Sequence, residues 1–254
     1  MQNLRAEPTK IPRAGELHCG CVVRNIKPPD RVIQLLSHEF VVGVDIHTHD
    51  WETNGGSKGG IGQFGFYTRD NSNSAQARIV QLGWTFSDCN GVVTTKERLV
   101  KNDGFVISDK AAQHHGITNK NAALGHNIRN VLHEFMSDMM EAVSLNGGRV
   151  VIHHLELDAA IISHELHRAG MRRMQEMWES IARRGICTMD PELGRWVRQC
   201  FDFETSPNIN LNTMRLNFML NRLVPEEGTV SRVTGSEKHV MLYLALQRLL
   251  KDFE

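Results

Sequence analysis

The chain has 254 residues, 41% of them hydrophobic, and its 29 lysines and arginines balance its 29 aspartates and glutamates. This length is enough for one large core, and the sequence lacks the run of about 18 uncharged apolar residues that would predict a membrane-spanning helix. A formal net charge of zero excludes a strongly basic surface over the whole molecule, so a nucleic-acid site has to be a local patch.

The N-terminal segment and the cysteines indicate the compartment. The segment Met1 to Lys10 is polar and contains no apolar leader, so we expect an intracellular protein, either cytoplasmic or nuclear. The cysteines are odd in number and lack the paired spacing of a zinc finger or a disulfide framework. We therefore expect reduced thiols at Cys19, Cys21, Cys89, Cys187 and Cys200.

The first part of the chain predicts an extension followed by strands. Residues 1–38 contain several breakers and one short helix that begins at Asp30, so we assign them to an N-terminal extension, and residues 39–254 to the main domain. Apolar and β-branched runs predict strands over 39–46, 61–67 and 78–86. Their short connections favour an antiparallel meander.

In the second half of the chain, helical and strand patterns alternate. Helical spacing of apolar residues predicts helices over 127–145, 155–169, 173–182, 191–200, 211–223 and 237–252, with short strands at 149–152 and 185–188. Strands first and strand–helix alternation afterwards predict an α/β fold with a mixed sheet flanked by helices.

Two groups of carboxylates and imidazoles follow predicted buried strands. Asp45 and His47 are two residues apart at the end of the first strand, so they lie on one face of the sheet and could share a metal. His154 and Asp158 are four residues apart where a strand runs into a helix, and they share a helix face there. Each group alone also fits an ordinary structural role, as a helix-dipole partner or a hydrogen-bonded histidine. Together they indicate a functional site.

The order of these motifs resembles the DEDDh family of 3′–5′ exonucleases, which are RNase H-like nucleases of the proofreading-subunit type. Asp45-Ile46-His47 stands in the place of the family's Asp-x-Glu, and His115-Gly116-Ile117-Thr118 matches its His-Gly-Ile-Thr segment. The segment from Ile152 to Asp158 aligns with Ala-His-Asn-x-x-Phe-Asp. The resemblance covers residues 39 to 252 and implies an RNase H-like mixed five-stranded sheet flanked by helices.

The family uses four carboxylates to hold two divalent ions and a histidine as general base. The resemblance implies that Asp45 and Asp158 are the first and third acids, and that His47 replaces the second. The last motif, histidine followed five residues later by aspartate, is broken. If His239 is the base, Leu244 occupies the acid position; if Glu237 is the acid, Arg232 occupies the base position.

These replacements predict weak magnesium binding, because magnesium prefers oxygen ligands in near-ideal geometry. Manganese or zinc, which accept imidazole, could still bind Asp45, His47 and Asp158, with His153, His154 or His239 nearby. The cofactor expected for an active enzyme is therefore a divalent metal, magnesium or manganese, and a protein without hydrolysis needs none.

Three functions stay open. The first is a pseudo-enzyme that binds the 3′ end of single-stranded DNA or RNA through His115, Gly116, Ile117 and Thr118. Trp51 or Phe64 would be stacking surfaces. Arg172 and Arg173, from the arginine-rich segment Arg168 to Arg184, would contact the phosphates. The second is an active 3′–5′ exonuclease in which His47 or Glu52 replaces the missing ligand. The third is a protein-interaction module on this fold, and a homodimer through residues 127–145 is a further alternative.

Overall fold

A computed structural model of the chain describes residues 26–50, 75–88, 91–201 and 234–251. Several predicted features lie outside these residues, namely the strand at 61–67, the helix at 211–223, and Cys19, Cys21, Trp51, Glu52, Phe64, Cys89 and Arg232. Within the described ranges no helix has both the length and the apolar character that a bilayer crossing requires.

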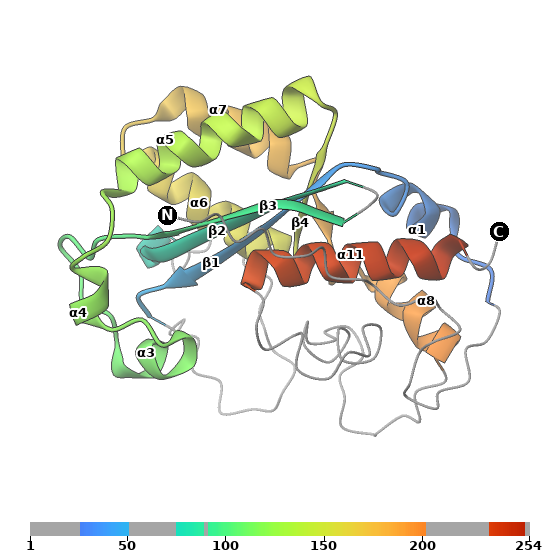
Figure 1. Ribbon diagram of the computed structural model, residues 1–254, viewed down its shortest axis with the longest axis horizontal. Helices are drawn as coiled ribbons and strands as arrows, with labels where there is room; N and C mark the ends of the chain where they lie inside the picture. Colours follow the sequence, from blue (N-terminus) through green and yellow to red (C-terminus); the bar gives the residue numbers. More distant parts are fainter. Residues whose placement is uncertain (1–25, 51–74, 89–90, 202–233, 252–254) are drawn as a thin grey trace, which may run out of the picture.

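The centre of the fold is one mixed sheet. Its strands are β1 (Val41–Thr48), β2 (Ile79–Asp88), β3 (Gly91–Leu99), β4 (Arg149–Ile152) and β5 (Ile186–Cys187). They lie in the order β3-β2-β1-β4-β5, in which β3, β2 and β1 are antiparallel and β1, β4 and β5 are parallel (Figure 1). The predicted five-stranded mixed sheet is confirmed.

The edge strand β3 was missed because its sequence lacks apolar alternation. Its middle is the polar run Thr94 to Arg98, so no row of buried apolar side chains marks one face of the strand. Charged side chains hold the strand in place instead. Lys96 Nζ lies 2.7 Å from Asp138 Oδ2, and Arg98 Nη2 lies 2.7 Å from Glu134 Oε1. Both acids belong to the helix above the sheet, so tertiary ion pairs, and not local pattern, position this strand.

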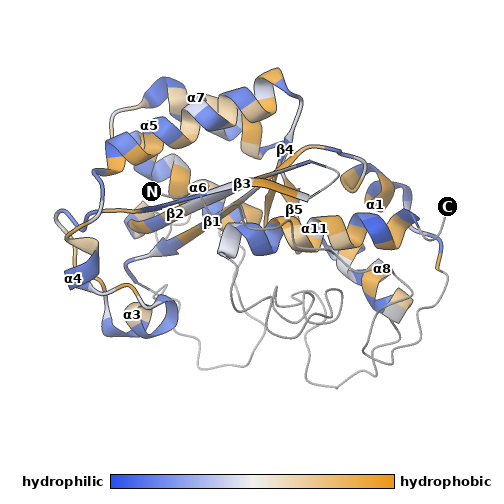
Figure 2. Cartoon of the chain, viewed as in Figure 1, coloured by the Kyte–Doolittle hydropathy of each residue, from blue (hydrophilic) through white to orange (hydrophobic). Residues whose placement is uncertain are grey.

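Two helical layers enclose the sheet (Figure 1). One contains α5 (Ile128–Met139), with its continuation η2 (Met140–Leu145), α6 (Leu155–Arg168) and α7 (Arg172–Ala182). The other contains α11 (Gly235–Lys251), α8 (Pro191–Phe201) and α1 (Asp30–Leu35). Two short helices, α3 (Asp109–His115) and α4 (Asn119–Ala122), connect β3 to α5. Each layer buries its own apolar cluster, and hydrophobic residues recur along the whole of α11 (Figure 2).

Helix α1 belongs to the segment predicted as an extension, and it packs into the core. Val32 and Leu36 are buried in the same cluster as Trp196 of α8. Arg31 Nη2 lies 2.7 Å from Asp190 Oδ2, while Asp190 Oδ1 accepts from two backbone N–H groups in the first turn of α8. The domain boundary predicted at residue 38 stays a prediction. Residues 26–36, which precede it, pack against helices of the main domain.

The start of β2 is tied to α6 by one buried carboxylate. Glu165 is 1% exposed and accepts from Arg78 Nε at 3.0 Å, from the Ile79 backbone N–H at 3.1 Å and from Arg168 Nε at 3.3 Å. Arg168 also donates to two backbone carbonyls before β2, so this arginine belongs to the fold and is not free for a nucleic-acid patch.

We expect Glu165→Ala to lower the free energy of unfolding by about 3 kcal/mol, because it leaves a buried N–H and two guanidinium groups without their acceptor. Urea unfolding measures this loss. Glu176→Ala, an exposed site on α7, is the control and should change stability by less than about 0.5 kcal/mol. An equal effect of the two substitutions would contradict the assignment.

Candidate functional site

Asp45 lies in the middle of the candidate site, on β1 and against the N-terminal end of α11. Its side chain is 24% exposed. Glycine is required at position 235, the first residue of α11, because a Cβ there would overlap the Asp45 carboxylate. Gly43, two residues before Asp45, similarly lets the α11 backbone approach β1, since a Cβ would overlap the Ser236 carbonyl oxygen. The two glycines therefore bring the helix start onto the carboxylate.

His239 contacts this carboxylate from the first turns of α11. Its ring is 2% exposed, Nδ1 lies 2.7 Å from the Val44 carbonyl oxygen, and Nε2 lies 3.8 Å from Asp45 Oδ1. A carbonyl can only accept, so Nδ1 carries the proton and Nε2 of the neutral ring carries a lone pair. Burial lowers the pKa of His239 to about 4, so the ring is neutral at physiological pH.

His47 contacts the other oxygen of Asp45 and stacks on His115. His47 Nε2 lies 4.0 Å from Asp45 Oδ2, and the two imidazole rings are 5.2 Å apart at an angle of 27°. Burial, followed by the neighbouring histidines, lowers the pKa of His47 to about 4. His115 Nδ1 accepts from the Ile117 backbone N–H, so Nε2 donates to the Thr48 carbonyl oxygen at 3.2 Å.

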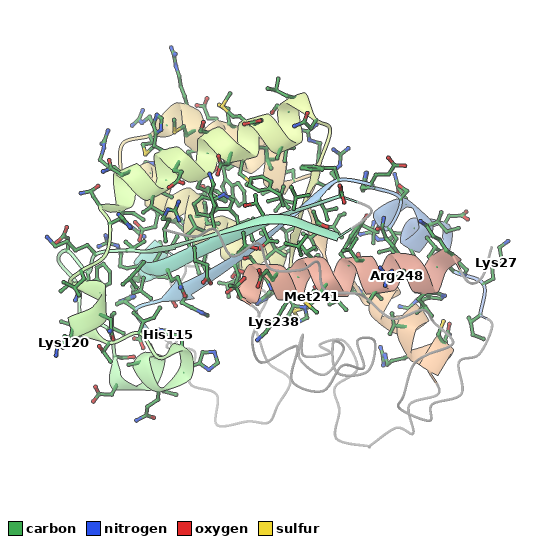
Figure 3. The ribbon with its side chains drawn as sticks, in the orientation of Figure 1. Lys27, His115, Lys120, Lys238, Met241 and Arg248 are labelled. Atoms are coloured by element: carbon green, nitrogen blue, oxygen red, sulfur yellow. The ribbon has the colours of Figure 1, made fainter. Side chains whose placement is uncertain are left out.

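The His115 to Thr118 segment forms the connection between α3 and α4. Gly116 ends α3 with a φ of 76°, a conformation that favours glycine, and Thr118 begins α4 by accepting from the Asn121 backbone N–H. Ile117 is buried in a small cluster with Val80. The stack of His115 on His47 places this connection next to Asp45, on the same side of the molecule as the start of α11 (Figure 3).

Asp158, in the first turns of α6, lies near Asp45. Burial raises its pKa well above the ordinary value, and the charge of Asp45 raises it further. His154, immediately before α6, has a φ of 85°, which is unusual for a residue other than glycine. The neighbouring His153 is 2.8 Å from Thr188 Oγ1 through Nδ1, and its ring centroid is 6.4 Å from that of His239.

Glu97 was missed by sequence reasoning. It lies on β3, and the register Asp45–Gly83–Glu97 runs straight across three strands. Because Gly83 has no side chain, Glu97 leans over it: Glu97 Oε1 would be 3.6 Å from a Cβ at that position. Burial, followed by the charge of Glu97, raises the pKa of Asp45 to about 7. Only the pairing of β3 with β2 brings this acid to the site, so no local motif indicated it.

The two predictions on the last motif have separate outcomes. Glu237 accepts from the Thr234 backbone N–H and from Thr95 Oγ1, both at 2.8 Å, so it caps α11 and ties it to β3. Leu244 is 4% exposed and packs in the apolar core, away from the site.

Lys238 was also missed by sequence reasoning. It lies close enough for its charge to lower the pKa values of Asp45, His47 and His239. It projects from the start of α11 (Figure 3).

The predicted arginine patch is divided. Arg172 and Arg173 are exposed in the first turn of α7, whereas Arg183 and Arg184 follow its last residue. Nine residues lie between the two pairs, and equivalent positions are 11 residues apart, which corresponds to about 16 Å along a helix. All four lie with the helical layer of α5, α6 and α7, and not with α11 (Figure 1).

Within the described residues, the side chains around Asp45 do not fit the two-ion arrangement that the resemblance implies. Asp45 and Asp158 lie close together, but the groups nearest the Asp45 oxygens are the imidazoles of His47 and His239, at 4.0 Å and 3.8 Å. In the described ranges no group of three or more histidine, cysteine, aspartate or glutamate side chains is placed to hold a metal ion. Magnesium in particular lacks the oxygen ligands that it prefers.

The burial of His239 predicts a pH dependence of stability. Its pKa is about 4 in the folded protein against 6.5 ordinarily. The folded state then binds fewer protons than the unfolded state between these values, so stability rises with pH across this window, by about 3 kcal/mol in total. In urea unfolding between pH 4 and 7 with a chelator present, we expect the wild-type protein to gain about 3 kcal/mol more than His239→Gln. Parallel curves for the two proteins would contradict this prediction.

Comparison with known proteins shows the fold. No protein-family model and no curated protein matches the sequence. Solved structures do match: E. coli exonuclease I in complex with a dA16 oligonucleotide has a TM-score of 0.58 at 13% identity, covering 85% of this chain and 41% of that one. A zinc-bound form of the E. coli ExoI–ssDNA complex has a TM-score of 0.56 at 13% identity, covering 85% and 41%.

A third match, an ExoI/SSB-Ct complex, has a TM-score of 0.56 at 14% identity and covers 85% and 42% of the two chains. The chain thus spans less than half the length of these structures. The fold is that of the RNase H-like exonucleases, as the resemblance predicted. The chain resembles exonuclease I in its fold.

Proposed function

We propose that this chain binds the 3′ end of single-stranded nucleic acid in the site around Asp45, with weak or lost hydrolysis. The observation that carries this proposal is the stack of His115 on His47, which sets the His115 to Thr118 connection beside Asp45. Solved structures of the same fold are complexes with dA16 and with ssDNA. A terminal nucleotide against this connection would reach Asp45 and Lys238.

The donor set supports weak hydrolysis. His47 is neutral, is stacked on His115 and lies 4.0 Å from Asp45, so it adds no negative charge where the exonuclease pattern has a glutamate. His239 is fully buried with its proton on Nδ1. Its Nε2 lies 3.8 Å from Asp45 Oδ1 and the residue is 2% exposed, so this ring is poorly placed to take a proton from an attacking water.

An active exonuclease that uses manganese is the second candidate. The observation in its favour is that Asp45 lies close enough to Asp158 for its charge to raise the pKa of Asp158, as expected of two carboxylates that could share an ion. A denaturing gel distinguishes the two candidates, because binding alone leaves the oligonucleotide at full length.

Binding is tested by fluorescence anisotropy with a 5′-labelled oligonucleotide that has either a free or a blocked 3′ hydroxyl, in chelator and at about 50 mM salt, where electrostatic contacts are strong. We expect micromolar affinity and preference for the free end. Three or four phosphate contacts give a log–log salt slope of about −2 to −3, since each adds about 0.7 for single strands.

We expect Arg172→Ala with Arg173→Ala to weaken binding and to reduce the size of the slope by about 1.4, which corresponds to two phosphates. Arg183→Ala with Arg184→Ala is the matched control at the other end of α7. Lys238→Gln, beside Asp45, should reduce the slope by about 0.7. Absence of binding to every single strand at low salt would reject the proposal and favour a protein-interaction module. Equal effects of the two arginine pairs would reject Arg172 and Arg173 as a specific contact.

A further inference from the structure

Strand β3 forms an edge of the sheet, and the first half of this strand is exposed. In the order β3-β2-β1-β4-β5, β3 pairs with β2 on one side, and no described strand lies on its other side. Val92 is 38% exposed, Val93 is 61% exposed, and Thr94 is also exposed. Alternate residues of an antiparallel edge strand direct their backbone N–H and C=O groups outward. With β-branched side chains beside them, these groups are a template for pairing with another strand.

The charges that commonly protect an edge strand are neutralised in β3. Lysines at a sheet edge oppose pairing, because they repel a second edge. Lys96 Nζ lies 2.7 Å from Asp138 Oδ2. Arg98 Nη2 lies 2.7 Å from Glu134 Oε1, so acids of α5 hold both cations. Both cations belong to the second half of the strand, and the run from Val92 to Thr94 contains no charge.

A second copy of the chain suits this edge. The formal net charge is zero, so no net repulsion opposes the association of two copies. When two identical antiparallel strands are related by a twofold axis, the residue on the axis lies opposite itself. A centre at Lys96 would set two lysines opposite each other, which is unfavourable. A centre at Val93 sets the two valines opposite each other and Val92 opposite Thr94 of the second copy, and such β-branched pairs stabilise a sheet.

We propose that the protein forms a homodimer in which the β3 edges of two copies pair antiparallel around Val93. The pairing joins the two five-stranded sheets into one and buries the exposed valines. It uses residues 91–95 of each copy, a span of about 17 Å. An interface of this length is at the small end for protein pairs, so we expect a dissociation constant on the order of micromolar. This surface differs from residues 127–145, the segment considered above for a homodimer, and it goes beyond the proposed function because it needs no nucleic acid.

Sedimentation velocity of the full chain, from about 1 to about 200 μM, measures the dimer across the expected dissociation constant. Val93→Lys should raise this constant by at least about tenfold, because it sets two lysines opposite each other on the axis. The exposed position accommodates a lysine in the folded chain, which circular dichroism checks. Val106→Lys is the matched control, at a valine that is 73% exposed, and it should leave the dissociation constant unchanged.

A mixture of two variants tests whether residue 93 meets its own copy. Val93→Lys and Val93→Asp should each be monomeric where the wild-type protein is dimeric. Their equimolar mixture should restore the dimer, because only the unlike pair sets opposite charges against each other on the twofold axis. A mixture that stays monomeric would contradict the pairing around Val93.

Two further results would overturn the proposal. The first is a wild-type monomer at the highest concentration, whether another segment of the chain or another protein covers the edge. The second is a wild-type dimer that Val93→Lys leaves intact. If Leu145→Lys, at a leucine that is 79% exposed in η2, dissociates that dimer, the interface lies at residues 127–145 instead.

Discussion

With magnesium as the only divalent ion, we expect no shortening of a single-stranded oligonucleotide above the level seen in chelator. Magnesium requires near-ideal oxygen coordination, and among the described residues we expect Asp45 and Asp158 alone to serve as acids of a two-ion arrangement. His47 and His239 offer nitrogen instead. A denaturing gel over several hours at micromolar protein, with and without excess magnesium, measures this.

The informative control is Asp158→Asn, which removes one of the two acids and keeps the size of the side chain. Robust turnover in magnesium that Asp158→Asn abolishes would show that the imidazoles do not weaken the site. Turnover that survives this substitution would indicate a contaminating nuclease. Restoring an acid at Leu244 is not a usable test, because that side chain is 4% exposed in the core and a charge there would unfold the protein.

Gly43→Ala should destabilise the protein by at least about 3 kcal/mol, because overpacking at a backbone contact forces β1 and α11 apart. The added Cβ would overlap the Ser236 carbonyl oxygen and lie 2.8 Å from Val240 Cγ2. Neither neighbour can move without displacing the start of α11, which carries His239. Urea unfolding followed by circular dichroism measures the loss.

Gly194→Ala is the matched control for this substitution. Gly194 lies inside α8 with nothing within 4 Å of an added Cβ, so alanine should leave stability unchanged or raise it by up to about 1 kcal/mol. If Gly43→Ala were as stable as the wild-type protein, the close approach of α11 to β1 would be wrong, and with it the placement of His239 beside Asp45.

Local pattern predicted most of the helices and singled out two of the acids in the candidate site. The helices at 155–169, 173–182, 191–200 and 237–252 were predicted within two residues of α6, α7, α8 and α11, because their apolar residues recur at helical spacing. The carboxylates of Asp45 and Asp158 were identified from strand ends that run into polar residues. The structure places these two acids close together, and the resemblance to the DEDDh exonucleases gave the correct mixed sheet.

The tertiary structure alone decided which other side chains meet Asp45. Glu97 lies near the site only because β3 pairs with β2 in the register that sets Glu97 opposite Gly83. That register cannot be read from the local sequence of either strand. His239 faces Asp45 because Gly43 and Gly235 admit α11 to the sheet, whereas Leu244 on the same helix points into the core. Strand register and helix approach depend on contacts between residues far apart in the chain. For this reason the sequence by itself determined the two acids, and only the fold decided their partners.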